Sequence, residues 1–184
     1  MNEGVTDNQG EKNIAAPAMR PRPARPLISI VAPCFNEEAA LAPFMAALAP
    51  VVEGADFDYE LVFIDDGSTD GTRACLERLT AENPRVRAII FSRNFGKEAA
   101  LTAGLDHAAG DAVVIIDTDL QDPPALIRDF VKKWREGVDV VYGQREDRTK
   151  DTAAKRVTAE SFYRVFNRIS AIKIPENAGD FRLM

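Results

Sequence analysis

The most constraining feature of this sequence is a short apolar run that ends in a cluster of acids. Residues 112–116 are apolar without interruption, with Gly110 shortly before them and two prolines shortly after. An apolar run of this length between turn residues is typical of a strand that is buried on both faces. Asp117, Asp119 and Asp122 follow the run directly. We therefore predict a central buried strand whose carboxyl end carries several acidic side chains.

These acids predict a site for a divalent cation. Alternation of side chains along an extended backbone places Asp117 and Asp119 on the same side, where the two carboxylates repel each other unless a positive charge lies between them. Mg²⁺ and Mn²⁺ are commonly held by one or two carboxylates together with substrate phosphates. The alternative is that the acids cap a helix starting near Pro123, which suits Asp122 but not the other two.

Strand-like and helix-like patterns alternate along most of the chain. This alternation predicts an α/β fold with a mainly parallel central sheet flanked by helices. Polar loops follow the first four strands, and the carboxyl ends of parallel strands form the edge where open sheets bind ligands. The predicted strands cover residues 27–32, 59–64, 86–91, 112–116 and 138–142.

Length and composition divide the chain into three parts. Its 184 residues suffice for one domain with a sizeable core. Residues 1–26 are polar and then rich in Ala, Pro and Arg, so we predict a disordered tail. Residues 27–144 form the predicted core. Residues 145–184 have helical apolar spacing with interleaved bases, which fits either packing on the sheet or a membrane interface; we expect the chain to end before membrane helices.

Charge is distributed unevenly between these parts. Residues 27–144 hold 20 acidic and 10 basic residues, which argues against a nucleic-acid partner. Residues 145–184 hold 9 basic and 6 acidic residues and are suited to an anion or an anionic membrane surface. No apolar run approaches the roughly 20 residues that cross a bilayer, and the N-terminus lacks the core of a signal peptide. We expect this chain to be soluble and not exported.

Several residues of the strand-end loops are candidates for ligand contacts. Pro33, Phe35 and Glu37 could sandwich a base, and Asp66 could accept hydrogen bonds from a ribose or a base, while Asp70 suits a helix cap. Lys97, with Arg93 nearby, could meet phosphate at a helix N-terminus or remain solvated.

Two arginines follow the fifth predicted strand, and the only histidine lies elsewhere. Arg145 and Arg148 offer planar forks suited to phosphate, unless Glu146 and Asp147 pair with them locally. His107 lies among alanines on a predicted helix, away from the loops. A Ser/His/Asp or Cys/His arrangement is therefore disfavoured.

Motifs at these loops resemble those of the family 2 glycosyltransferases. Within that family the chain is similar, over residues 27–184, to the polyprenyl-phosphate branch of bactoprenol glucosyltransferases and dolichol-phosphate mannosyltransferases. Two of the motifs, SRNFGKE and GDFR, are similar to the bactoprenol type in particular. The motifs are PCFNEE (33–38), DDGSTDGT (65–72), SRNFGKE (92–98), DTDLQDPP (117–124), YGQR (142–145) and GDFR (179–182).

The resemblance implies a single Rossmann-like nucleotide-sugar domain of the GT-A type. It also implies Mg²⁺ or Mn²⁺, and sugar transfer from a UDP-sugar or GDP-mannose to a polyprenyl phosphate at the cytoplasmic membrane face, in a full-length protein anchored by membrane helices. UDP-glucose is the favoured donor, and the oligomeric state is left open. The implied roles are nucleoside binding for Pro33, Phe35, Glu37, Ile64 and Asp66, metal binding for Asp117, Asp119 and Gln121, phosphate binding for Arg145, and an acceptor-side carboxylate for Asp180.

The expected mechanism is inverting and depends more on positioning than on proton abstraction. An acceptor phosphate has a second pKa of about 6 and is largely ionised already. Arg145, aided by Arg148 or Arg156, is expected to hold it, and Asp119, Arg145 and Asp180 form the expected catalytic set. Two alternatives stay open: a polysaccharide hydroxyl acceptor, for which Asp180 would be an indispensable base, and a non-catalytic nucleotide-binding module.

Overall fold

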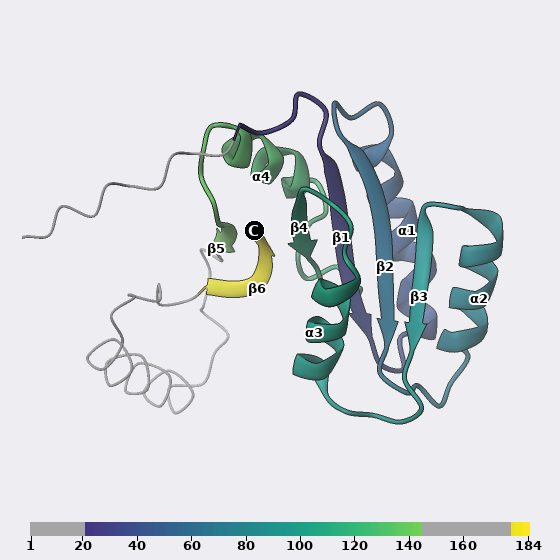
Figure 1. Ribbon diagram of the computed structural model, residues 1–184. Coiled ribbons are helices and arrows are strands. Elements are labelled where there is room, and N and C mark those ends of the chain that lie inside the picture. Colours follow the sequence, from purple (N-terminus) through teal and green to yellow (C-terminus); the bar gives the residue numbers. More distant parts are fainter. Residues whose placement is uncertain (1–20, 145–177) are drawn as a thin grey trace, which may run out of the picture.

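Strands and helices alternate up to residue 144, as the sequence predicts, in a computed structural model that describes residues 21–144 and 178–184. Figure 1 shows the strands side by side, with helices on both faces of the sheet. The elements are β1 (Leu27–Cys34), α1 (Glu38–Val52), β2 (Asp58–Asp65), α2 (Thr72–Glu82), β3 (Val86–Ile90), α3 (Lys97–His107), β4 (Ala112–Ile115), α4 (Leu126–Arg135), β5 (Val141–Gln144) and β6 (Ala178–Leu183).

The sheet is mostly parallel and has the strand order β3-β2-β1-β4-β6-β5. β1 pairs in parallel with both β2 and β4, and β2 pairs in parallel with β3. β6 is antiparallel to its neighbours β4 and β5. The α/β class with a mainly parallel sheet is thus confirmed, and the carboxyl ends of β1 to β4 meet at one edge.

Two apolar layers hold the helices on the sheet. The larger layer joins α1, α2 and α4 to one face, where the ring of Phe44 meets that of Phe63 edge to face at a centroid distance of 6.0 Å. The smaller layer holds α3 against the other face through Ala100. Gly104 permits a close approach there, since a Cβ at this position would lie 2.4 Å from a methyl group of Val31. α3 is therefore fixed on β1 and β2.

β6 corrects the expected division of the chain at residue 144. The segment 145–184 was expected to be helical, yet residues 178–183 form a strand within the core sheet. Phe181 and Leu183 are buried and share the larger apolar layer, with the ring of Phe181 4.7 Å from that of Phe130. Alternation of apolar and polar residues over 180–183 is the strand signal that explains the difference. Residues 145–177 lie outside the described part of the chain.

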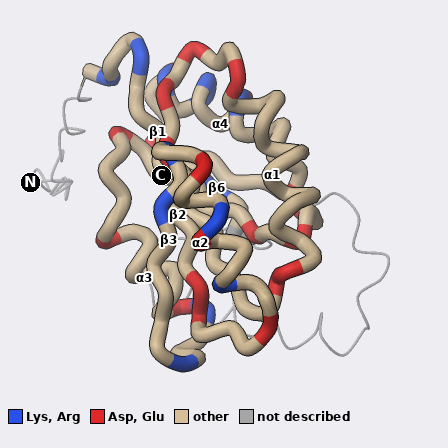
Figure 2. Tube along the Cα trace, turned by 90° about the vertical axis from the view of Figure 1, so that its right-hand side faces the viewer, with Lys and Arg blue, Asp and Glu red and all other residues tan. Residues whose placement is uncertain are grey.

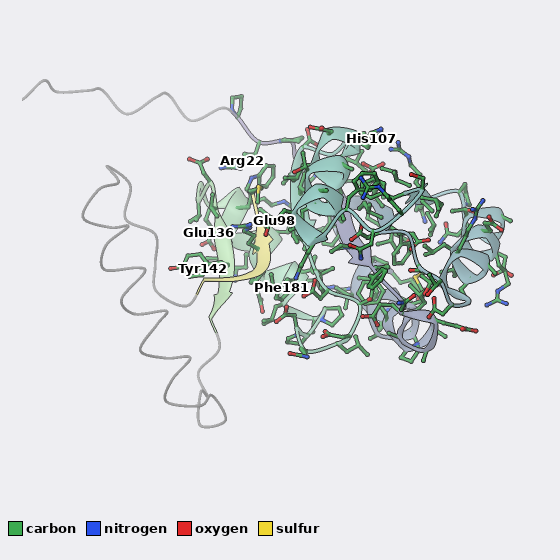
Figure 3. The ribbon with its side chains drawn as sticks, turned by 90° about the horizontal axis from the view of Figure 1, so that it is seen from below. Arg22, Glu98, His107, Glu136, Tyr142 and Phe181 are labelled. Carbon is green, nitrogen blue, oxygen red and sulfur yellow. The ribbon has the colours of Figure 1, made fainter. Side chains whose placement is uncertain are left out.

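Residues 22–26, expected as part of a disordered tail, make specific contacts with the core. The guanidinium of Arg22 lies 4.0 Å from the ring centre of Trp134 on α4 and donates to the carboxylate of Asp139 at 2.8 Å. Arg135 donates to the carbonyl of Ala24. Figure 3 shows Arg22 on the same side of the molecule as Glu136, at the end of α4. Residues 22–26 therefore connect the end of α4 to β1, the strand that begins directly after them.

Replacing Arg22 with Ala is expected to lower the free energy of unfolding by about 1 kcal/mol, because a largely buried cation–π contact and an ion pair are lost together. Arg25→Ala is the matched control, since Arg25 and its partner Asp58 are more than half exposed and such pairs contribute little. Urea denaturation of the two variants measures the difference. Equal losses in both variants would contradict the contact with Trp134 as its cause.

Candidate active site

A pocket of about 290 Å³ opens at the edge where β1 to β4 end. Each of these strands, or the loop that follows it, contributes side chains, so the pocket depends on the strand pairing and not on any single loop. The predicted crevice at the carboxyl ends of the strands is therefore present. It is lined by Pro33, Cys34, Phe35, Glu37, Asp66, Asn94, Gly96, Lys97, Ala100, Asp117, Thr118 and Asp119.

The loops after β1 and β2 hold each other in place through hydrogen bonds. The side-chain oxygen of Asn36 accepts from the amide of Thr69 at 2.9 Å, and the amide of Asn36 donates to the hydroxyl of Ser68 at 2.9 Å. The amide of Glu37 donates to the hydroxyl of Thr72 at 2.8 Å. Asp70 accepts from the amide of Thr72, the first residue of α2. The N-cap position is held by Gly71 and has no side-chain cap hydrogen bond, so the predicted cap at Asp70 is wrong. This cross-linking fixes the backbone of Glu37 beside the pocket.

Asp66 organises the loop between β3 and α3. Its carboxylate oxygens accept from the amides of Phe95 and Gly96 at 2.7 and 2.9 Å, and the residue is 4% exposed. Gly67 has a φ of 70°, and a Cβ there would lie 2.3 Å from the carbonyl carbon of Arg93. The loop after β2 therefore holds the loop after β3 through the Asp66 carboxylate and through the close approach of Gly67 to Arg93. Asp66 is a positioning residue as well as a pocket residue.

The acidic residues after β4 line the pocket, although not through the predicted side-chain alternation. β4 ends at Ile115, and the three consecutive residues Asp117, Thr118 and Asp119 all line the pocket. The carboxylate of Asp117 lies 2.8 Å from the ammonium group of Lys97. An oxygen of Asp119 accepts from the amide of Gln121 at 3.0 Å, and Leu120 between them has a φ of 59°. A non-glycine residue in the left-handed region is a form of strain that concentrates at functional sites.

The pocket has an excess of negative charge. Figure 2 shows acidic and basic positions spread over the whole body, whereas in the pocket lining four acids meet one lysine. Burial raises the pKa of Glu37, and the carboxylates of Asp119 and Asp117 raise it further. Burial raises the pKa of the Cys34 thiol, with further contributions from Asp65 and Glu37. A cation entering this pocket would relieve the repulsion between the carboxylates.

The carboxylates of the pocket fit a cation that is bound partly by the protein and partly by phosphate groups of a ligand. Within residues 21–144 and 178–184, no three acidic, histidine or cysteine side chains gather closely enough to enclose an ion. Asp117 and Asp119 supply two carboxylates to the pocket lining. Two carboxylates completed by phosphate oxygens and water are an ordinary arrangement for Mg²⁺. The residues therefore fit a metal that is held jointly with a diphosphate.

Some predicted site residues lie away from the pocket. Ile64 is fully buried and packs with Val31 and Ala100 beneath α3. Gln121 is exposed and is not among the lining residues. Asp180 lies in β6, two residues before Arg182, whose register partner is Ile115 at the end of β4. The predicted phosphate ligands Arg145, Arg148 and Arg156 lie outside the described residues.

Sequence reasoning missed Asn94, Thr118, Cys34 and Ala100 as lining residues. Asn94 and Thr118 stand next to predicted residues in the same loops, so proximity in sequence was the available signal. Cys34 was expected to be a reduced core thiol, and it is both free and buried. His107 accords with the prediction: it lies ten residues along α3 from Lys97, or about 15 Å of helix rise.

Asp66→Asn is expected to lower the free energy of unfolding by about 1–3 kcal/mol, since an amide keeps one acceptor oxygen and one loop amide loses its partner. Hydrogen exchange at Phe95 and Gly96 should accelerate in the same variant. Asp111→Asn is the control, because its contact is a single acceptance from the amide of Leu27, which Asn can maintain. Unchanged exchange in Asp66→Asn would show that the carboxylate does not hold this loop.

Glu37→Gln is expected to stabilise the ligand-free protein at neutral pH. The pKa of Glu37 is raised in the folded state, so the folded chain binds this proton more tightly than the unfolded chain. The resulting stabilisation is present at acid pH and is lost as pH rises through the folded pKa. The gain from Gln should therefore shrink as pH falls from 7 towards 4 in chemical denaturation, with Glu82→Gln on α2 as control. A gain that is the same at both pH values would contradict this origin.

Comparison with known proteins identifies the family. The model of the family "Glycosyl transferase family 2" matches residues 29–184. A bactoprenol glucosyl transferase of Shigella phage SfV is 50% identical over 157 residues, which cover 85% of this chain and 51% of that protein. The chain thus spans about half the length of this curated relative.

Solved structures share the fold. A mannosyltransferase from Pyrobaculum calidifontis in complex with GDP-Man and Mn²⁺ is 28% identical with a TM-score of 0.58, over 66% of this chain and 36% of that one. Glucosyl-3-phosphoglycerate synthase from Mycobacterium tuberculosis, in complex with Mn²⁺, UDP and phosphoglyceric acid, is 26% identical with a TM-score of 0.59, over 86% and 55%. The family match, the relative and the shared fold agree, and the chain belongs to glycosyl transferase family 2.

Proposed function

We propose that this chain carries the catalytic domain of a metal-dependent, inverting glycosyltransferase that moves a sugar from a nucleotide-sugar donor to a polyprenyl phosphate. The observation that carries the proposal is the pocket itself, where Glu37, Asp66, Lys97, Asp117 and Asp119 converge from the ends of neighbouring parallel strands. The 50% identity to a bactoprenol glucosyl transferase supports a lipid acceptor of the polyprenyl type and a glucosyl group as the sugar; UDP-glucose is the donor that we propose.

The donor's nucleoside is assigned to the side of the pocket formed by β1 and β2. Phe35 is 45% exposed and Pro33 lies beside it in the lining, so an apolar edge is available to a base. Glu37 and Asp66 offer carboxylate oxygens near this edge. Asp66 already accepts from two amides, but each carboxylate oxygen has a further lone pair for a donor group of the ligand.

The diphosphate is assigned to the opposite side, between Lys97 and the end of β4. A bound Mg²⁺ or Mn²⁺ would supply positive charge to offset the charge that grows on the leaving nucleoside diphosphate. Asp117 and Asp119 would hold this ion from the pocket wall, with Gln121 close to them in sequence. The Mn²⁺ in the two structural neighbours is consistent with this assignment.

The acceptor reacts through a phosphate oxygen. That oxygen forms a bond to the anomeric carbon of the sugar, and the bond from this carbon to the diphosphate breaks with its electron pair leaving on the nucleoside diphosphate. Attack from the face opposite the leaving group inverts the anomeric centre. A phosphate monoester with a second pKa of about 6 is mostly ionised at neutral pH, so Arg145, Arg148 and Arg156 are assigned to its positioning and Asp180 to a minor role.

The proposed place of reaction is the cytoplasmic face of a membrane, because a polyprenyl chain resides in the bilayer. The name of the phage relative supports a lipid acceptor, and thus a place at the membrane, but does not name the face. Within the described ranges, every helix is too short or too polar to span a bilayer. Attachment is assigned to the basic segment 145–177, which holds 8 basic residues and 5 acidic ones and suits anionic lipid headgroups.

Asp119→Asn is expected to lower kcat/KM for transfer from UDP-glucose to a polyprenyl phosphate by about 100-fold or more, whereas Asp180→Asn should cost about tenfold or less because the acceptor needs little base catalysis. Transfer of labelled sugar in detergent with Mn²⁺ measures both, and Asp111→Asn at the other edge of the sheet is the control.

The reverse order of the two losses would contradict the phosphate acceptor. Turnover with a polysaccharide hydroxyl acceptor alone, abolished in Asp180→Asn, would support the alternative in which Asp180 is the base. UDP or GDP binding in calorimetry without turnover on either acceptor would indicate a nucleotide-binding module.

A further inference from the structure

Among the described residues that line the pocket, Lys97 is the one basic residue. It already forms an ion pair with an acidic residue. Its ammonium nitrogen lies 2.8 Å from a carboxylate oxygen of Asp117. The two side chains are 40% and 33% exposed, so the pair lies at the pocket wall and not in open solvent. Asp117 is also one of the two carboxylates assigned to the metal, and the ammonium group therefore competes for the same oxygens.

The backbone that carries Lys97 is fixed, although its side chain is long. Lys97 is the first residue of α3, and the preceding Gly96 has a φ of 96° and donates its amide to Asp66. One turn later Ala100 is fully buried against β1 and β2. The ammonium group can therefore move by side-chain rotation alone, between Asp117 and a ligand beside the start of α3.

A diphosphate in this pocket would offer Lys97 an anionic partner other than Asp117. Gly96, Lys97 and Ala100 line the pocket, so the N-terminus of α3 lies at the pocket wall, and a helix N-terminus favours an anion. A lysine at this position can bind phosphate as a point charge. A cation alone, by contrast, has to approach Asp117 against the repulsion of the ammonium group.

We propose that Lys97 acts as an internal counter-ion that occupies Asp117 in the donor-free protein and transfers to the donor's diphosphate when the nucleotide binds, so that metal and nucleotide bind cooperatively. The inference rests on the proposed nucleotide-sugar site and adds a regulation of metal entry to it. By thermodynamic linkage, the factor by which UDP tightens Mn²⁺ binding equals the factor by which Mn²⁺ tightens UDP binding.

The test compares Lys97→Met with the wild-type chain in calorimetric titrations with MnCl₂, with and without saturating UDP. Without UDP, the variant should bind Mn²⁺ about three- to tenfold more tightly, because one competing positive charge is gone. The factor by which UDP tightens Mn²⁺ binding should fall in the variant, and its UDP affinity at saturating Mn²⁺ should drop about tenfold. Lys133→Met should behave as wild type. It removes an exposed lysine of α4 whose ammonium nitrogen lies 2.9 Å from a carboxylate oxygen of Glu136.

A second measurement examines the counter-ion without metal or nucleotide. Acylation of Lys97 by an amine reagent, followed by mass spectrometry in the donor-free chain, should rise several-fold in Asp117→Asn and not in Asp111→Asn. Unchanged acylation would overturn the proposal. The proposal would also be overturned if, without UDP, Lys97→Met bound Mn²⁺ no more tightly than the wild-type chain while still binding UDP. Failure of UDP and GDP to bind any of these proteins would instead refute the proposed function, and the inference with it.

Discussion

The parallel pairing of β1 with β2 and β4 is the constraint on which the rest of the structure depends. The β1–β2 register runs from Leu27 to Cys34 without a shift, and β4 pairs on the other side of β1. Because these strands run in the same direction, their last residues must lie at one edge. Cys34, Asp65 and Ile115 end their strands there, and each is followed within a few residues by a pocket acid. The pocket is thus a consequence of strand direction, and its chemistry is set by the residues that follow each strand.

Much of this arrangement could be predicted because it depends on short-range patterns. The apolar run before Asp117 predicted a strand, and β4 lies inside the sheet between β1 and β6. Side-chain alternation was the wrong reason to expect Asp117 and Asp119 together, because both follow the end of β4 and Thr118 between them also lines the pocket. The fold class followed from the alternation of strand and helix patterns. What could not be predicted depends on contacts between distant segments. Arg22 packs on Trp134 across more than a hundred residues, and the helical spacing before residue 178 obscured the short alternation in β6.

Asp66 shows the limit of inferring roles from residue type. A carboxylate after a strand was expected to bind the nucleoside, and Asp66 does line the pocket. The structure adds that both of its oxygens accept amides of the next loop, which the sequence does not reveal because the partners are backbone groups. The loop that carries Lys97 is thereby held by the residue expected to contact the ligand. Ligand contact and loop position are therefore linked at Asp66.

The pKa of a carboxylate is shifted in opposite directions at the two ends of the strands. This contrast distinguishes the functional edge of the sheet from the structural one. At the edge away from the pocket, burial opposes ionisation of Glu60, but hydrogen bonds from Ser29, the amide of Ala109 and Arg87 outweigh it and lower the pKa. At the pocket edge, burial and neighbouring acids raise the pKa of Glu37. A fold selected for stability alone would supply both carboxylates with donors. In the pocket, Lys97 pairs with Asp117, and Glu37 and Asp119 lie in the same lining. This arrangement becomes favourable once a cation and a diphosphate complete it.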